Sequence, residues 1–259
     1  MAIKIKTQEE IEGIRESSKL AAQTLNYIEP FVQEGVDTET LDQKIYNFIA
    51  RHNAKPAPLN YNGFPKSSCI SLNEVVCHGI PSKKTVLQNG DILNIDITTN
   101  LNGYYGDTSR MFTVGEPSDQ ARNLIDVTKK CLDLGIEQCY PNNQFGNIGY
   151  GISTYAEAHG YSVVYEFCGH GVGTAFHEEP EIAHTAAKDS GPLMKPGMVF
   201  TIEPMINQGK ARVKVDKNDE WTATTIDNKL SAQFEHTILI TGNGSEVTTD
   251  LKNEYAEKT

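Results

Sequence analysis

Two aspartates in the segment 91–109 occupy the polar face of a strand-like pattern. Apolar residues at 93, 95 and 97 alternate with polar ones that include Asp96, as in a β-strand with one polar face. Asn102-Gly103 is typical of a hairpin turn, after which a second strand carries Asp107. Asp107 lies directly opposite Asp96 if the loop centres on residues 101–102, and diagonally opposite if Asn102-Gly103 forms the turn. Both registers keep the carboxylates on one face, where either a metal ion offsets their repulsion or both are solvated.

Two glutamates, Glu203 and Glu235, occupy polar positions between apolar neighbours in later strand-like segments. Pro204 is expected to end the first of these strands or to place it at a sheet edge. Taken singly, each residue is typical of a surface glutamate. Four such carboxylates on four strand-like segments instead favour a shared acidic site.

Two histidines lie close together in the second half of the sequence. His170 stands between glycines, which let backbone and ligand approach closely, and His177 follows seven residues later. A phosphate-binding loop needs Lys followed by Ser or Thr after its second glycine, and residues 174–176 do not supply them. A set of two Asp, two Glu and one His suits Mn, Fe, Co or Zn. An excess of carboxylates favours two ions ~3.5–4 Å apart, as in metal-dependent hydrolases.

The elements that must position these residues alternate between helical and strand-like stretches. A capping box of Thr7 and Glu10, apolar residues at helical spacing and a stop at Pro30 predict the first helix. Helices are predicted over 7–29, 38–52, 118–140 and 145–159, and strands within 68–114, 161–207 and 231–241. This order predicts one α+β domain of two similar halves, about 1–115 and 116–245. The polar tail from Gly242 is expected to be peripheral.

The composition is that of a soluble globular protein, with 38% hydrophobic and 22% charged residues among 259. A net charge of −11 disfavours sequence-independent nucleic-acid binding and docking on anionic membranes. No apolar run approaches the ~20 residues that span a bilayer, and no apolar segment of a signal peptide follows residues 1–6. Five cysteines without metal-finger spacing indicate free thiols, so we expect a cytoplasmic protein.

Read together, these segments resemble the methionine aminopeptidase family. The matching blocks are Asn73–Pro81, Asn94–Asp96 with Gly106–Thr108, Gly169–Gly171 with Phe176–Pro180, Thr201–Pro204 and Gln233–Thr237. The likeness runs from about Lys4 to Thr241. Only 31 residues separate Glu203 from Glu235, so the chain resembles type I enzymes rather than type II, which carry a helical insertion there. The sequence shows no long N-terminal extension, and bacterial members of the family likewise lack one.

The resemblance implies the pita-bread fold, a pseudo-twofold antiparallel sheet flanked by helices, in a single catalytic domain over 1–259. It also implies two divalent metal ions, of cobalt, manganese, iron or zinc. Asp107 and Glu235 would bridge both ions, Asp96 would chelate one, and His170 and Glu203 would hold the other. A hydroxide shared by the ions would attack the scissile carbonyl, with Glu203 as general base.

The family also implies how the substrate is held. His177 would hydrogen-bond the carbonyl oxygen, His78 would contact the backbone of the second residue, and the α-amine would complete the shell of the ion held by Asp96. The methionine pocket would be formed by Tyr61, Phe64, Cys69, Phe176 and Trp221. Such an aromatic box with a thiol suits a thioether, because sulfur interacts favourably with aromatic edges. Some relatives carry Tyr at the position of Phe64 and Cys at that of Pro58, which affects the pocket mouth and not the metals.

The implied activity is removal of the initiator methionine from nascent polypeptides whose second residue is small and uncharged. The implied partner is the nascent N-terminus, which the family implies is met at the ribosome, and we expect a monomer that binds neither nucleic acid nor membrane. Two other classes stay open. A proline-specific peptidase of this fold usually carries a large extra N-terminal domain. A non-catalytic binding protein of this fold would have lost metal ligands, whereas all five ligand positions are present here.

Overall fold

The computed structural model describes residues 3–251, and its first half begins with two helices. They are α1 (Gln8–Ile28) and α2 (Thr38–Arg51). The 3-10 turn η1 (Glu29–Phe31) follows α1 directly, and a second 3-10 turn, η2 (Tyr61–Gly63), lies after α2. The predicted capping box is present, because Thr7 Oγ1 accepts from the Glu10 N–H and the Glu10 carboxylate accepts from the Thr7 N–H. Both predicted helices are confirmed to within two residues.

A long hairpin dominates the sheet of the first half. Its strands β4 (Ile92–Leu101) and β5 (Tyr104–Thr113) are joined at Asn102-Gly103, both with positive φ, as in the turns that suit right-twisted strands. Strands β1 (Lys55–Pro56) and β2 (Cys69–Leu72) also pair with β4. Asp96 therefore pairs with Ser109, and Asp107 with Thr98. The diagonal register holds, and the directly opposed one does not.

The second half repeats the order of helices and strands. The helices are α3 (Asp119–Glu137) and α4 (Gly146–Ala158), which confirms both predictions with slightly shorter ends. A five-stranded sheet has the order β15 (Ser245–Val247), β14 (His236–Ile240), β9 (Val199–Ile202), β7 (Gly169–Gly171) and β8 (Glu178–Ile182). There are two smaller sheets. One has the order β13 (Ser231–Gln233), β10 (Met205–Asn207) and β6 (Ser162–Val163), and the other has the order β11 (Val213–Val215), β12 (Ala223–Thr225) and β3 (Val75–Cys77). Within residues 3–251 these strands pair antiparallel.

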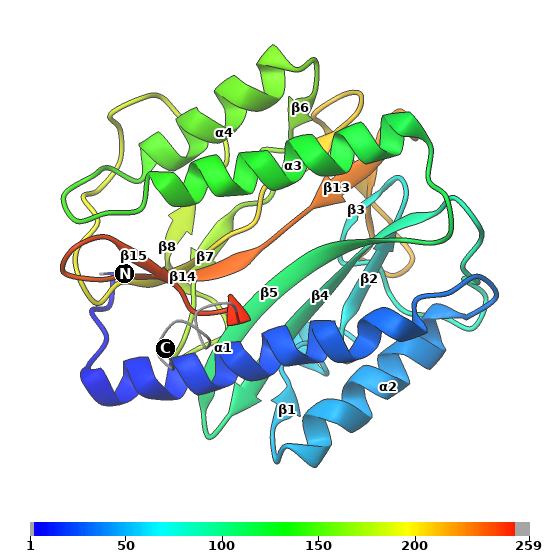
Figure 1. Cartoon of the computed structure of the whole chain (residues 1–259), viewed down its shortest axis with the longest axis horizontal. Helices are drawn as coiled ribbons and strands as arrows, with labels where there is room; N and C mark the ends of the chain where they lie inside the picture. Colours follow the sequence, from blue (N-terminus) through cyan, green and yellow to red (C-terminus); the bar gives the residue numbers. More distant parts are fainter. Residues whose placement is uncertain (1–2, 252–259) are drawn as a thin grey trace, which may run out of the picture.

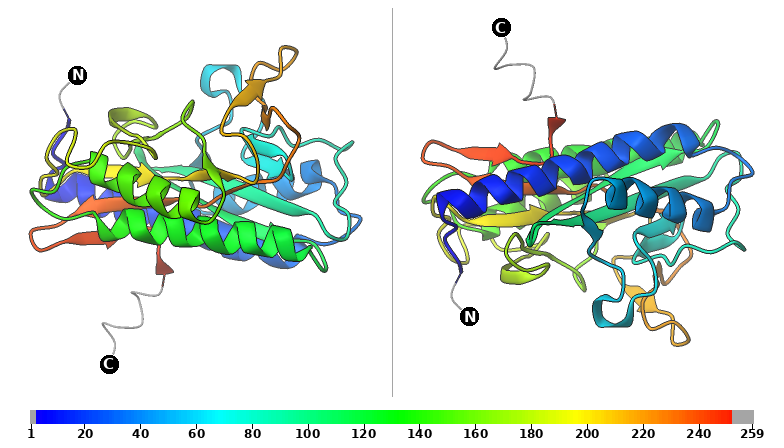
Figure 2. Two further views of the ribbon diagram at one scale, coloured as in Figure 1. Left: turned by 90° about the horizontal axis from the view of Figure 1, so that it is seen from above. Right: turned by 90° about the horizontal axis from the view of Figure 1, so that it is seen from below.

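The helices α1 and α3 lie on one side of the strands, and their long axes run across the molecule (Figure 1). Turned by 90°, the molecule shows the β11–β12 hairpin and the η2 segment projecting from the opposite side (Figure 2). One buried apolar cluster packs α1 and α2 against β4, and another packs α3 and α4 against β9 and β14. No described helix is long and apolar enough to cross a membrane.

Two parts of the sequence prediction need correction. The segment from Gly242 is only partly peripheral, because β15 pairs with β14 and the Thr249 hydroxyl is hydrogen-bonded to His236 Nδ1 at 2.8 Å; its last residues, 252–259, lie outside the described residues. The β11–β12 hairpin was not predicted, because each strand has only three residues and the segment between them is mostly polar. The five cysteines are free thiols, as expected.

Candidate metal centre and substrate cavity

Every site residue predicted from the sequence lines one cavity of about 560 Å³. The cavity lies where the β4–β5 hairpin meets the sheet of the second half, since Ser109 and Glu235 exchange backbone hydrogen bonds there (3.0 and 3.4 Å). The predicted residues in its lining are Tyr61, Phe64, Cys69, His78, Asp96, Asp107, His170, Phe176, His177, Glu203, Trp221 and Glu235.

Glu203 and Glu235 both sit at breaks in strands rather than inside them. Glu203 and Pro204 separate β9 from β10, and residues 234–235 separate β13 from β14. Ile202 pairs with His236 and Met205 with Gln233, so the register is the same on both sides of the break. The two glutamates therefore lie opposite each other, at positions where neither backbone is part of a regular strand.

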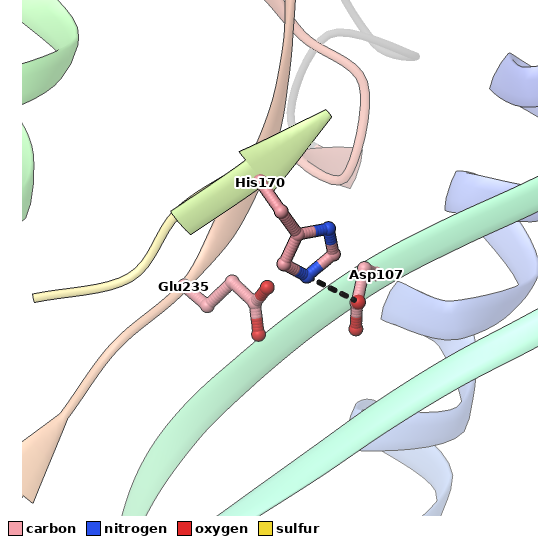
Figure 3. Close-up of side chains that lie close together, drawn as sticks. All are labelled: Asp107, His170 and Glu235. Atoms are coloured by element: carbon pink, nitrogen blue, oxygen red, sulfur yellow. Dashed lines mark ion pairs between the residues drawn. The ribbon is translucent and has the colours of Figure 1, made fainter. Parts of the chain in front are cut away.

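Three of the carboxylate and histidine side chains meet closely. One ligand atom each from Asp107, His170 and Glu235 lies within 4.8 Å of the others, and Figure 3 shows these side chains converging from β5, β7 and the break between β13 and β14. His170 Nε2 lies 3.7 Å from Asp107 Oδ2 and 3.6 Å from Glu203 Oε1. Asp96 and Glu235 lie close enough for each carboxyl group to shift the pKa of the other. The five predicted ligands thus form one cluster at the cavity floor.

Hydrogen bonds from neighbouring side chains orient this floor. Thr98 Oγ1 donates to Asp107 Oδ1 (2.7 Å), and Thr201 Oγ1 donates to Glu203 Oε1 (2.8 Å) while accepting from the His170 N–H (3.0 Å). Gln233 Nε2 donates to the second oxygen of Glu203 at 3.3 Å. Ligands held in this way keep one orientation, as in metal sites whose outer partners fix the inner residues.

The tautomer of His170 follows from its contacts. Its Nδ1 lies 3.0 Å from the carbonyl oxygen of Gly171, which can only accept, so Nδ1 carries the proton. Burial lowers the pKa of His170 to about 4. The imidazole is therefore neutral at pH 7, and its Nε2 lone pair faces the carboxylates as a metal ligand would.

Burial also sets the charge state of the four carboxyl groups. It raises the pKa of Asp96 to about 7 and that of Glu203 to about 8. The pKa values of Asp107 and Glu235 are raised well above the usual range, first by burial and then by the neighbouring carboxylates. Such a cluster is costly to ionise without a cation.

The residues present fit divalent metal ions. None of the described residues that line the cavity is Lys or Arg, so no such side chain faces the carboxylates from the lining. Asp96 Oδ1 is buried and has no hydrogen-bond partner. Carboxylate oxygens with one neutral imidazole are the ligand set of Mn, Fe, Co and Zn sites.

Aromatic rings and two histidines form the cavity wall. Tyr61 packs against Phe176 (ring centroids 4.7 Å apart), and Phe64 meets Trp221 edge-on (5.2 Å). His177 Nδ1 lies 3.0 Å from the Tyr61 hydroxyl oxygen. Desolvation and the nearby histidines His170 and His78 lower the pKa of His177 to about 3.

His78 and Trp221 are held by unusual local structure. His78 has φ +56°, and burial lowers its pKa to about 4. The Asp219 carboxylate accepts from the N–H groups of Trp221 (2.8 Å) and Thr222 (2.9 Å), which fixes the turn that presents the Trp221 ring. Asp219 was not foreseen from the sequence, because a polar loop gives no signal of which ring it orients.

Other residues that support the floor were missed as well. Thr98 belongs to the polar alternation around Asp96, so that signal was available. Thr201 and Gln233 lie two residues before Glu203 and Glu235, at polar positions of the same kind of alternation, so the same signal was available there. His184 is fully buried, and its Nε2 accepts the N–H of Glu203 at 3.1 Å; burial lowers its pKa to about 3. His184 lies 19 residues before Glu203, and no sequence pattern links the two residues, so this contact could not be predicted.

Comparison with known proteins decides the family. Residues 12–242 match the model of metallopeptidase family M24. The methionine aminopeptidase of Rickettsia prowazekii (strain Madrid E) is 51% identical over 249 residues, which cover 96% of each chain. That of Escherichia coli (strain K12) is 48% identical over 255 residues, covering 98% of this chain and 96% of that protein. The chain belongs to the methionine aminopeptidases of metallopeptidase family M24.

Solved structures support the same assignment. The crystal structure of the methionine aminopeptidase from Rickettsia prowazekii has a TM-score of 0.95 at 50% identity, covering 96% of this chain and 100% of that one. The prolidase from Pyrococcus furiosus has a TM-score of 0.74 at 24% identity and is covered over 66% of its length, which shows a shared fold alone. The pita-bread fold and the expected enzyme class are confirmed: this methionine aminopeptidase is a metallopeptidase that removes the initiator methionine.

Proposed function

We propose that this methionine aminopeptidase acts on nascent chains with a small, uncharged second residue through a dinuclear metal centre. In this proposal Asp107 and Glu235 would hold both divalent ions, Asp96 would hold one of them, and His170 and Glu203 would hold the other. The observation that carries it is a buried cluster of four carboxyl groups and a neutral imidazole whose cavity lining contains no Lys or Arg among the described residues. Mn, Fe, Co and Zn all accept this ligand set.

The chemistry divides between the metals and the protein. When bound, divalent ions polarise a carbonyl and lower the pKa of water towards neutrality. Glu203 is assigned as the general base that takes the proton of the attacking water and returns it to the leaving amine. Hydrogen bonds from Thr201 and Gln233 to its two oxygens keep the carboxylate in one orientation.

His177 and His78 are assigned to the substrate backbone. A Tyr61 hydroxyl that donates to Nδ1 of His177 leaves the proton of the neutral ring on Nε2. This Nε2–H can then donate to the scissile carbonyl oxygen as negative charge develops there, which is the role of an oxyanion-hole donor. His78 is assigned to the backbone of the second residue.

The aromatic wall is assigned to the methionine side chain. Phe64 and Cys69 are buried, and Tyr61, Phe176 and Trp221 complete the lining. Sulfur–aromatic contacts are worth about 0.3–1.5 kcal/mol each, which favours an unbranched thioether over a branched aliphatic side chain.

We further propose that the chain works as a single catalytic domain, as a monomer, in the cytoplasm, and on nascent N-termini at the ribosome. Five free thiols support a reducing compartment, and the net charge of −11 argues against nucleic acid or an anionic membrane as a direct partner.

The test is hydrolysis of a Met-Ala-Ser peptide by metal-stripped protein, with Co or Mn added back in steps. We expect free methionine only after metal is added, and none when leucine replaces the first residue. Slow cleavage is expected when a large residue replaces alanine. Absence of release with Mn, Fe, Co and Zn, from a folded protein, would contradict the proposal.

A further inference from the structure

Lys6 is a buried cation that the reaction proposed above does not use. Its side chain is only 1% exposed, and its Nζ lies 2.5 Å from Oε1 of Glu178. The Lys6 backbone N–H donates to the carbonyl oxygen of Gly197 at 2.8 Å, which anchors the segment that precedes α1. Because a buried charge is stable only when it is paired, Lys6 and Glu178 depend on each other.

Glu178 in turn closes the loop that carries two cavity residues. Its Oε1 accepts from the Thr174 N–H (3.3 Å), and Thr174 Oγ1 donates to its Oε2 (3.3 Å). One carboxylate therefore joins the two ends of the segment 174–178. Phe176 and His177 lie between those ends and line the cavity.

The start of the same loop packs directly on Lys6. A Cβ at Gly173 would lie 2.4 Å from Ile14 Cδ1 and 3.3 Å from Lys6 Cε, and its φ of +133° is one that other residues rarely adopt. On the other side, the Gly173 carbonyl oxygen accepts from the Tyr105 N–H at 2.9 Å. The loop is thus held between β5 and the Lys6 side chain.

We propose that Lys6 is a positioning residue: through Glu178 it fixes the loop 173–178 so that His177 and Phe176 face the cavity. This inference rests on the roles proposed above for those two side chains. Without the ammonium, the Glu178 carboxylate keeps, among the described residues, only the exposed cation Lys4 nearby, whose Nζ donates to Thr174 Oγ1 at 3.1 Å. The carboxylate then moves toward solvent, and its bonds to Thr174 carry the loop with it. A displacement of about 1 Å at a reacting group lowers a rate by ~10²-fold.

The test compares three variants of the full chain loaded with metal. Lys6→Met keeps an unbranched side chain, one atom shorter than that of Lys, and removes its charge, and Lys6→Arg keeps the charge. The matched control is Arg15→Met, because Arg15 binds Glu246 through two hydrogen bonds (2.8 and 2.5 Å) and so ties α1 to β15 away from the cavity. The measurements are kcat and KM for Met-Ala-Ser, metal content, melting temperature and amide hydrogen exchange of residues 172–179.

We expect Lys6→Met to lower kcat by about 10- to 100-fold with unchanged metal content, and to speed exchange in the loop 173–178. Lys6→Arg should recover most of kcat, and Arg15→Met should lower the melting temperature without changing kcat or exchange in that loop. If Lys6→Met does not fold, Glu178→Gln makes the same test, since it removes the charge that pairs with Lys6 and keeps an acceptor for Thr174.

Wild-type kcat and exchange in Lys6→Met, with only a lower melting temperature, would overturn the inference, because Lys6 would then be merely structural. An equal loss of kcat in Arg15→Met would also overturn it. If the wild-type protein releases no methionine, the proposed function fails, and hydrogen exchange alone decides about Lys6: unchanged exchange in Lys6→Met overturns the inference, and faster exchange supports it.

Discussion

The floor and the wall of the cavity are built from different kinds of structure. The floor residues Asp96, Asp107 and His170 lie within strands, and Glu203 and Glu235 lie at strand breaks that share one register. Apart from Cys69 in β2, the wall residues come from turns and loops; His78 itself has a left-handed backbone, as do Asn60 and Asn62 on either side of Tyr61. The floor is accordingly fixed by the sheets, whereas the wall depends on a few side-chain contacts.

This difference separates two functions. Charge on the floor is expensive without metal, because burial raises the pKa of its carboxyl groups. The wall histidines His78 and His177 are neutral at pH 7, so the wall has no comparable free-energy cost of buried charge. Substitutions on the floor should therefore remove metal and activity together, and substitutions on the wall should change activity alone.

The largest effect is expected from the bridging carboxylates. Asp107→Asn or Glu235→Gln replaces a charged bridge by a neutral amide, which is a poor ligand for two cations. Loss of several kcal/mol of metal-supplied stabilisation lowers kcat by at least about 10³-fold, and the bound metal falls below two ions per chain. Metal analysis and methionine release measure both, with the exposed Asp126→Asn on α3 as control. Wild-type activity in either variant would refute the site assignment.

His177→Ala tests the wall directly. Removal of one donor to a developing oxyanion costs about 10²–10³-fold in kcat. Metal content should stay at the wild-type level, because His177 is assigned to the substrate and not to a metal. If the variant loses metal, His177 is a ligand, and the division between floor and wall is wrong.

Tyr61→Phe sharpens the same comparison with a smaller change. It removes only the hydroxyl that contacts His177 Nδ1 at 3.0 Å and keeps the ring against Phe176. We expect kcat to fall by roughly 10-fold, in line with one lost hydrogen bond to a catalytic group, while KM changes little. In the His177→Ala background the same substitution should have no further effect on kcat. Additive losses would show that Tyr61 acts only as a pocket wall.

The smallest effect is the pH dependence of stability in the metal-free protein. Burial raises the pKa of Asp96 to about 7 and of Glu203 to about 8, so above pH ~4 the folded state binds protons that the unfolded state has lost. These groups make the free energy of unfolding fall as pH rises towards 8. The buried histidines act in the opposite direction, but only below their unfolded pKa of ~6.5.

Between pH 6.5 and 8 the melting temperature of the metal-free protein should therefore fall, by a few degrees per lost kcal/mol. Added Mn should raise it most at pH 8, where the carboxylates are most ionised. Glu203→Gln should flatten the slope, because it removes one of the titrating groups. A melting temperature that rises through this window would contradict the charge states assigned to the floor.

Local sequence signals predicted much of the fold. The capping box at Thr7, the Asn102-Gly103 turn and the helical spacing of apolar residues each act within a few residues, so they can be recognised without the tertiary structure. The diagonal placement of Asp96 and Asp107 followed from the turn once its type was known. The resemblance to methionine aminopeptidases supplied what spacing could not, namely the joining of five distant blocks into one site.

Long-range contacts between residues with no local pattern were not predictable. Lys6 and Glu178 are 172 positions apart, and from the sequence each would be predicted to be an ordinary charged residue on the surface. Gln233 reaches Glu203, 30 positions away, only because the strand breaks at Glu203 and Glu235 face each other. The edge strand β15 was missed because its residues are only partly buried and lack clear alternation.

The central claim is that the carboxylate floor is a dinuclear metal site distinct from the substrate wall. The most direct measurement is calorimetric titration of Mn into metal-stripped protein, in two buffers of different ionisation enthalpy. We expect two ions per chain in the wild-type protein and in His177→Ala, fewer in Glu235→Gln, and protons released on binding at pH 7, because Asp96 and Glu203 are partly protonated beforehand. No saturable binding, or the same two-ion stoichiometry in Glu235→Gln, would contradict the account.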